Sequence, residues 1–206
     1  GIANFNNSLA QTFYNRGVDV TLFSFTLQYP SFLFPGKTQY EKGSPPKDLK
    51  IRTIINSVNP FNWIRVARKI NKENPDYVII RYWLPFMAPC LGTIARLLSK
   101  KIKILAITDN VIHLEKRIGD KMFTRYFVKS CDAFLALSSS VLDDLSQFTK
   151  TTAKKYMPHP IYNIFGNQIS KQNALSNLRL NSQDKHVLFF GFVRKYKGLD
   201  LMLKAM

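Results

Sequence analysis

The sequence predicts an α/β fold with a doubly wound parallel sheet. Two observations lead to this fold class: short apolar strands alternate with helical segments of about 10 to 15 residues, and turn residues separate them. Hydrophobic residues make up 46% of the 206 residues, which is enough for a buried core and argues against disorder. In such a fold, ligands bind at the carboxyl ends of the strands.

The first part of the chain is predicted to alternate between helix and strand. Apolar residues from Ile2 to Phe13 recur at helical spacing, and Gly17 is a suitable C-terminal glycine for this helix. The pair Asn59 and Pro60 predicts the start of the second helix. The predicted order is helix 1–14, strand 18–25, an irregular loop 26–50, strand 51–55 and a helix after residue 60.

A regular alternation follows, and it carries the fold prediction. The predicted order is strand 77–83, helix 86–99, strand 102–108, helix 116–129, strand 132–137, a helix capped by residues 138–140, and strand 154–157. Alternation of this kind implies βαβ units and therefore parallel pairing of the strands.

A change of composition predicts a domain boundary near residue 165. A polar stretch rich in Asn, Ser and Gln follows His159 and Pro160, and a new apolar strand is predicted over residues 186–192, before a helix from residue 199. We therefore expect a first domain over residues 1–165 and, over residues 166–206, a linker with the truncated start of a second domain. We also expect the first strand of the first domain to be missing, because a helix at residue 1 lacks the strand that should precede it.

The formal net charge of +17 is the largest anomaly of the composition. Such a charge attracts polyanions, including nucleic acid, phosphorylated small molecules and anionic lipids. A lysine-rich solvated surface is the alternative. The predicted helix after residue 60 has one basic face, formed by Arg65, Arg68, Lys69 and Lys72. This face could contact anionic lipid headgroups, at ~1 kcal/mol per cation, or it could be solvated.

Several classes of protein are not supported by the sequence. No apolar run approaches the ~18 to 20 residues that a membrane span needs, and no secretory leader is visible. Cys90 and Cys131 lie far apart in apolar stretches, without a CxxC pair or a Cys/His cluster. We therefore expect no metal site, and we expect two buried thiols in a reducing compartment.

The basic turn over residues 191–198 is the sharpest local signal. Gly191 lets the chain turn after a strand, and Arg194 and Lys197 place two cations just before a helix N-terminus, whose amides favour anions. The turn could therefore clamp a diphosphate. A solvated basic turn remains the alternative on composition alone.

The residues around this turn also resemble a known family. Residues 188–205 read LFFGFVRKYKGLDLMLKA, in which a glycine, two residues, an arginine, two residues and Lys-Gly follow one another. This run resembles the start of the nucleotide-binding domain in retaining GT-B glycosyltransferases of family four. Four further segments are similar to that family in the same order: residues 1–25, 75–96, 107–141 and 157–166. The resemblance therefore spans nearly the whole chain.

The resemblance implies an acceptor-side Rossmann-like domain followed by the start of a nucleotide-sugar domain. It implies transfer of a sugar from a nucleotide-diphosphate donor to a glycan or lipid-linked acceptor, with retention of configuration, in polysaccharide or cell-envelope synthesis. Arg194 and Lys197 match the residues that stabilise the departing diphosphate, Gly191 matches the donor-binding turn, and Gly1 matches a glycine that faces the donor. No metal or other cofactor is implied. The chain as given is expected to be inactive alone.

The chain departs from many relatives at Asp109, where they carry a histidine. An aspartate can orient a sugar hydroxyl but cannot act as an imidazole donor, so a catalytic role and a structural one both stay open. His113, four residues later, is a further candidate for acceptor binding, with a surface histidine as the alternative. Ser138 fits a helix cap first and an acceptor contact second. Tyr82 ends a strand where it could stack on a sugar or pack in the core.

Two other function classes remain to be weighed against the enzyme. The first is a basic module that binds nucleic acid or another polyanion, although the chain lacks a helix-turn-helix, a zinc finger or single-strand-binding aromatic motifs. The second is an interaction domain without chemistry, because fold does not imply function. For the enzyme we expect no specific nucleic-acid partner and a cytoplasmic location, with a peripheral position at the inner face of the membrane as an option.

Overall fold

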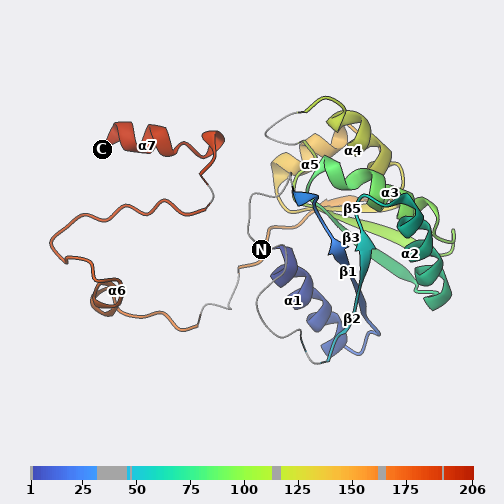
Figure 1. The fold of residues 1–206 in the computed structure, drawn as a ribbon, viewed down its shortest axis with the longest axis horizontal. Helices are drawn as coiled ribbons and strands as arrows, with labels where there is room; N and C mark the ends of the chain where they lie inside the picture. The colour runs from blue at the N-terminus through green and yellow to red at the C-terminus, as the bar shows by residue number, and fades with distance from the viewer. Residues whose placement is uncertain (1, 32–45, 47, 113–116, 162–165, 192) are drawn as a thin grey trace. The chain divides into compact units, whose positions relative to one another are not determined.

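The chain forms two compact units in the computed structural model, Gly1–Pro158 and His159–Met206. The structure describes residues 2–31, 46, 48–112, 117–161, 166–191 and 193–206. Figure 1 shows the course of the chain from the amino-terminal helix in blue to the carboxyl-terminal helix in red.

Helices and strands alternate through the first unit, as the sequence predicts. In chain order the elements are α1 (Ile2–Asn15), β1 (Thr21–Leu27), β2 (Lys50–Asn56), α2 (Pro60–Glu73), β3 (Tyr77–Tyr82), η2 (Pro85–Met87), α3 (Ala88–Arg96), β4 (Lys103–Thr108), α4 (Asp120–Val128), β5 (Ala133–Ala136), α5 (Ser139–Ser146) and β6 (Lys154–Tyr156). The predicted α/β fold class is therefore confirmed.

All described strand pairs are parallel, but the strands form two sheets rather than one. One sheet has the order β3-β4-β5-β6, and the other consists of β1 and β2. In the larger sheet, Tyr82 lies opposite Thr108, and Thr108 lies opposite Ala136. The carboxyl ends of β3, β4 and β5 therefore meet at one edge, as expected for strands joined by crossover helices.

The start of α2 follows from its capping residues. The side chain of Asn59 accepts a hydrogen bond from the backbone N–H of Asn62 at 3.2 Å, and Pro60 occupies the first helical position. Asn62 in turn donates to the carbonyl of Ile54 at 2.9 Å, so the helix start is attached to β2. The predicted capping pair is confirmed.

A single cluster of apolar side chains joins the larger sheet to its helices. α3 packs between α2 and α4, and residues of all three helices belong to the cluster. The rings of Tyr82 on β3 and Phe127 on α4 stack with their centroids 4.3 Å apart. Stacked aromatic rings add about 0.5 to 1.5 kcal/mol to the burial of their area, so this pair helps to fix α4 on the sheet.

Gly92 allows α3 and α4 to approach closely. A Cβ atom at this position would lie 2.9 Å from two ring carbons of Tyr126 and 3.3 Å from the Cα atom of Phe127. The ring of Tyr126 is itself held, because its hydroxyl lies 2.9 Å from that of Thr93 and the guanidinium of Arg96 lies 4.3 Å from the ring centroid. The ring therefore cannot move aside freely.

The second unit contains little regular structure among its described residues. It holds α6 (Lys171–Leu178), η3 (Lys195–Lys197) and α7 (Leu199–Ala205). The sequence analysis missed α6, which begins where Ser170 accepts a hydrogen bond from the N–H of Asn173 at 3.2 Å. The helix predicted from residue 199 is confirmed.

The strand predicted over residues 186–192 is wrong for its described part, residues 186–191, which hold no strand. A strand needs a neighbour for its backbone hydrogen bonds, and the described part of this unit offers none. Six apolar side chains in this stretch, the following turn and α7 are exposed by 60% or more: Val187, Leu188, Phe190, Val193, Leu201 and Leu203. Whether a domain boundary lies at residue 165 stays a prediction.

None of the described helices is long and apolar enough to cross a membrane.

We expect Gly92→Ala to lower the free energy of unfolding. Alanine is the better helix former by up to ~1 kcal/mol, but overpacking against a held ring and a neighbouring backbone costs about 1 to 3 kcal/mol. Urea denaturation of the variant checks this. In a Tyr126→Ala background the same change should cost less, because the two nearest atoms are gone. A Gly92→Ala protein more stable than the wild type would contradict the close approach.

Candidate functional site

At the carboxyl edge of the larger sheet, two predicted site residues follow neighbouring strands. Asp109 directly follows β4, and Ser138 follows β5 by two residues. The backbone N–H of Asp109 donates to the carbonyl of Tyr82 at 2.9 Å, which continues the pairing of β3 with β4. Both residues therefore lie where a doubly wound fold binds its ligands.

Asp109 is held by Arg81, a residue that the sequence analysis did not single out. The Nε of Arg81 donates to Oδ2 of Asp109 at 2.6 Å, and its Nη2 donates to Oδ1. Two parallel bonds of this kind fix the carboxylate in both distance and orientation. A charged residue inside the apolar strand VIIRYW was the signal that could have indicated this partner.

The guanidinium of Arg81 is buried in the first unit. Its central carbon lies 3.8 Å from the centroid of the Phe5 ring, which belongs to the first turns of α1. The Nη1 atom is buried and has no hydrogen-bond partner among the residues that the structure describes. The start of α1 thus lies beside the carboxyl edge of the sheet through this stacking contact.

Tyr82 packs in the core, which is one of the two positions that the sequence left open for it. Its side chain is 0% exposed, its ring stacks on Phe127, and its hydroxyl lies 3.0 Å from that of Thr124. Burial raises the pKa of Tyr82, so the phenol stays protonated. The sequence placed Tyr82 correctly at the end of a strand, but the alternation along β3 could not tell which face the helix α4 covers.

The neighbouring Trp83 ties the start of the loop after β1 to the carboxyl edge. Its indole Nε1 donates to the hydroxyl of Tyr29 at 2.6 Å, and its ring meets Phe25 edge-on at 6.3 Å. Tyr29 also stacks on Phe86, with centroids 6.1 Å apart. Burial raises the pKa of Tyr29, so this phenol also stays a neutral hydrogen-bonding group.

Ser138 acts as the cap of α5. Its hydroxyl oxygen accepts a hydrogen bond from the N–H of Val141 at 3.2 Å and lies 3.0 Å from the hydroxyl of Ser140. The capping role that the sequence favours is therefore confirmed. An acceptor contact by the same hydroxyl stays a prediction.

The basic turn lies in the second unit, in a conformation that depends on glycine. Gly191 has a φ of 120° and Gly198 a φ of 70°, values that other residues rarely adopt. Arg194 is extended and precedes η3, while Lys197 ends η3, and both side chains are exposed. A Cβ atom at Gly191 would lie 3.7 Å from Nζ of Lys197, so the ammonium group lies beside this glycine.

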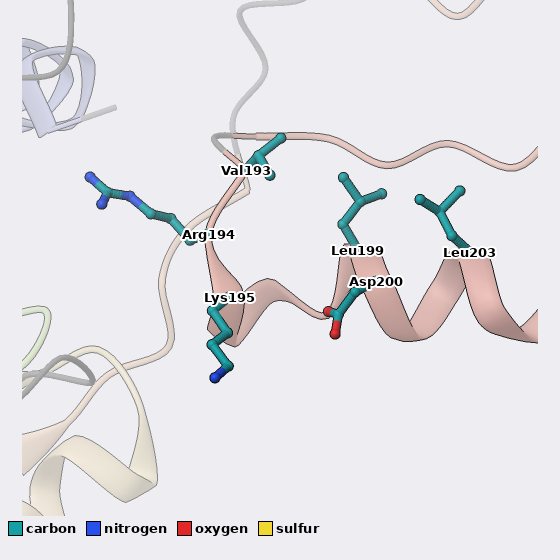
Figure 2. A pocket seen from close by; sticks show the side chains of 6 residues that line it. All are labelled: Val193, Arg194, Lys195, Leu199, Asp200 and Leu203. Carbon is teal, nitrogen blue, oxygen red and sulfur yellow. The ribbon is translucent and has the colours of Figure 1, made fainter.

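A shallow hollow of about 350 Å³ opens on the same turn. Figure 2 shows that Val193, Leu199 and Leu203 point to one side, whereas Arg194 extends away from the helix. Lys195 and Asp200 complete the lining. The hollow therefore combines an apolar wall with charged groups at its margin.

Two predicted site residues, Gly1 and His113, lie outside the described residues. Within the described part of the chain, no three His, Cys, Asp or Glu side chains gather in a way that could hold a metal ion.

The two cysteines are free thiols. Burial raises the pKa of Cys90 from 9.0 to about 12. Burial also raises the pKa of Cys131 to about 12, against a smaller lowering by the hydrogen bond with Ser130. A thiol that stays protonated at neutral pH is a poor nucleophile, so neither cysteine is suited to covalent catalysis.

Comparison with known proteins connects the first unit to one family. A family model described as Glycosyltransferase Family 4 matches residues 1–157. This range coincides with the first compact unit to within one residue. No curated protein matches the chain.

We expect Cys90 to resist iodoacetamide in the folded protein at pH 8.5 and to react quickly in denaturant, measured by mass spectrometry of the labelled peptides. The raised pKa of Cys90 also makes the free energy of unfolding depend on pH. The unfolded thiol loses its proton from about pH 9, before the folded one, so the stabilising effect of the buried thiol is present below pH 9 and is lost towards pH 12. A Ser139→Cys variant, whose thiol would be exposed, is the reactive control. Equal labelling of both sites in the folded state would contradict the burial of Cys90.

Proposed function

The chain belongs to glycosyltransferase family 4, and we propose from this that it moves a sugar from a nucleotide-diphosphate donor to a glycan or lipid-linked acceptor. The observation that carries the proposal is the family match, which covers the first unit to within one residue and includes Asp109 at the carboxyl edge of the larger sheet. We further propose that the first unit is the acceptor-side domain of a GT-B enzyme and that the product retains the configuration of the donor.

In the proposed reaction, the acceptor hydroxyl attacks the anomeric carbon from the face that the nucleotide leaves. A new bond forms between the acceptor oxygen and the anomeric carbon, while the bond from that carbon to the phosphate oxygen breaks. The electron pair of the broken bond goes to the diphosphate, and a donor phosphate oxygen takes the proton of the hydroxyl. The protein has mainly to stabilise the growing negative charge of the diphosphate.

Arg194 and Lys197 are the residues proposed for this stabilisation. Both are exposed cations on a turn shaped by Gly191 and Gly198, and the ammonium group of Lys197 lies beside Gly191. A missing side chain at Gly191 lets a diphosphate approach the backbone closely. With two cations in place, the proposed reaction needs neither a metal ion nor another cofactor.

The proposed acceptor site lies at the carboxyl edge of the first unit. Asp109 offers carboxylate oxygens to a sugar hydroxyl, and Ser138 lies on the neighbouring strand connection. Gly1 and His113 stay proposals for the donor and acceptor sides, respectively, from the family resemblance alone.

We also propose that the chain works within a longer protein. The exposed apolar side chains of residues 187–203 would form part of a core in a complete nucleotide-sugar domain.

For the location of the enzyme we propose the cytoplasm, with α2 resting on the inner face of the membrane. The outer side of this helix is exposed and combines two apolar residues with three cations: Phe61, Ile64, Arg65, Arg68 and Lys72. Such a surface suits anionic lipid headgroups.

We expect Arg194→Ala to lower kcat of the enzyme that carries this chain by about 10²- to 10³-fold, the usual loss when one donor to a developing oxyanion is removed. Release of nucleoside diphosphate from a panel of sugar nucleotides, with cell-envelope glycans as acceptors, measures it. Lys204→Ala removes an exposed cation of α7 and is the control. An Arg194→Ala enzyme with wild-type rates would contradict the assignment of Arg194 to the diphosphate.

Steeply salt-dependent DNA binding that nucleotides do not displace would favour the polyanion-binding alternative.

We expect the triple change Arg65→Gln, Arg68→Gln, Lys72→Gln to weaken binding to phosphatidylglycerol vesicles. Each cation near such a surface contributes about 1 kcal/mol, so the loss should reach about 3 kcal/mol at low salt. Cosedimentation measures binding, and phosphatidylcholine vesicles are the control. Undiminished binding of the variant to the anionic vesicles would exclude α2 as the contact.

A further inference from the structure

Arg81 is a charged residue in a place where charge is costly. Its side chain is 5% exposed, and it lies on β3 between the buried residues Ile80 and Tyr82. Removing a guanidinium from water is costly, and an ion pair recovers this cost only with good geometry. A pair of well-packed apolar side chains often stabilises a core as much or more. Stability alone is therefore a weak reason for this arrangement.

The contacts of Arg81 restrict both position and rotation of its guanidinium. The two hydrogen bonds to Asp109 fix the edge that carries Nε and Nη2, and the Phe5 ring lies 3.8 Å from the central carbon. A planar group that is bonded along one edge and stacked on one face cannot turn. The carboxylate that it holds is therefore fixed as well.

Arg81 and Asp109 differ in exposure, so Asp109 is the partner that a ligand can reach. The side chain of Asp109 is 20% exposed, four times the exposed fraction of Arg81. Two bonds from Arg81 use about half of the roughly four lone-pair positions of a carboxylate. The remaining positions only accept hydrogen bonds, so a ligand that meets Asp109 must donate one, as a sugar hydroxyl does.

We propose that Arg81 is a positioning residue, which holds Asp109 so that its free lone pairs accept a hydrogen bond from one hydroxyl of the acceptor sugar. This inference rests on the proposed glycosyl transfer and assigns a recognition chemistry to its acceptor side. Without the two bonds, the Asp109 carboxylate would rotate about its terminal torsion, which is broad and weakly restrained. A displacement of about 1 Å at a reacting pair lowers the rate by up to ~10²-fold.

Arg81→Lys tests the proposal, because lysine keeps the charge but cannot form the planar fork. Acceptor kcat/KM of the complete enzyme should fall by about 10- to 10²-fold, while the KM for the sugar nucleotide stays within about twofold. Asp109→Asn should show the same selective loss. The double variant Arg81→Lys/Asp109→Asn should be no worse than Asp109→Asn, because Arg81 acts only through that carboxylate.

Arg52→Lys is the matched control. Arg52 forms the other described ion pair with a carboxylate, at 2.9 Å from Glu73, and Glu73 ends the helix that leads into the amino end of β3. This pair therefore lies away from the carboxyl edge, and Arg52→Lys should leave the acceptor kcat/KM unchanged. Thermal melting of every variant separates loss of recognition from loss of folding.

Several results would overturn the assignment of Arg81. The first is an Arg81→Lys enzyme whose acceptor kcat/KM is within about threefold of the wild type. The second is an Arg81→Lys enzyme that loses kcat/KM equally for donor and acceptor. The third is an Arg81→Lys change that lowers the acceptor kcat/KM as much in the Asp109→Asn background as in the wild type. If Arg81→Lys does not fold, the neutral pair Arg81→Met/Asp109→Asn replaces it. An acceptor kcat/KM of that variant equal to the wild-type value would also contradict the assignment of Arg81. A wild-type enzyme that transfers no sugar from any nucleotide overturns the proposed function too, whereas the other results leave transfer intact.

Discussion

Parallel pairing of the strands is the constraint on which the arrangement of the first unit depends. Each parallel pair needs a connection that crosses the sheet, so helices pack on the sheet and every strand ends at the same edge. β3, β4 and β5 therefore bring residues that lie 26 or more positions apart in sequence to neighbouring places. The contact between Arg81 and Asp109 exists because β3 and β4 pair in this direction and register.

In our proposal, apolar packing stabilises the fold at that edge, whereas the buried ion pair serves recognition. Apolar packing, as between Tyr82 and Phe127, holds the helices on the sheet without any ionic contribution. Arg81 holds a carboxylate at a fixed place beside the start of α1. A fixed carboxylate can discriminate hydroxyl donors from other groups, because its orientation does not have to be set on binding.

In the second unit, the local sequence is sufficient for a helix and a turn but not for a strand. Residues 186–191 have the composition of a buried strand, yet they form none, because backbone hydrogen bonds need a partner strand. α6 forms nearby because a helix satisfies its own backbone groups and Ser170 caps its start. The basic turn also forms without a partner segment, because the conformation of a turn depends on only a few neighbouring residues, here with glycines at positive φ.

The sequence by itself determined the alternation of elements, the caps at Asn59 and Ser138, and the family to which the chain belongs, because periodicity and capping are short-range properties. It also placed Asp109 at the end of a strand. Only the tertiary structure decided that Tyr82 is covered by α4, that the strands divide into two sheets, and that Asp109 is held by Arg81. These outcomes depend on which elements become neighbours, and a single sequence carries no direct record of contacts between residues far apart in the chain.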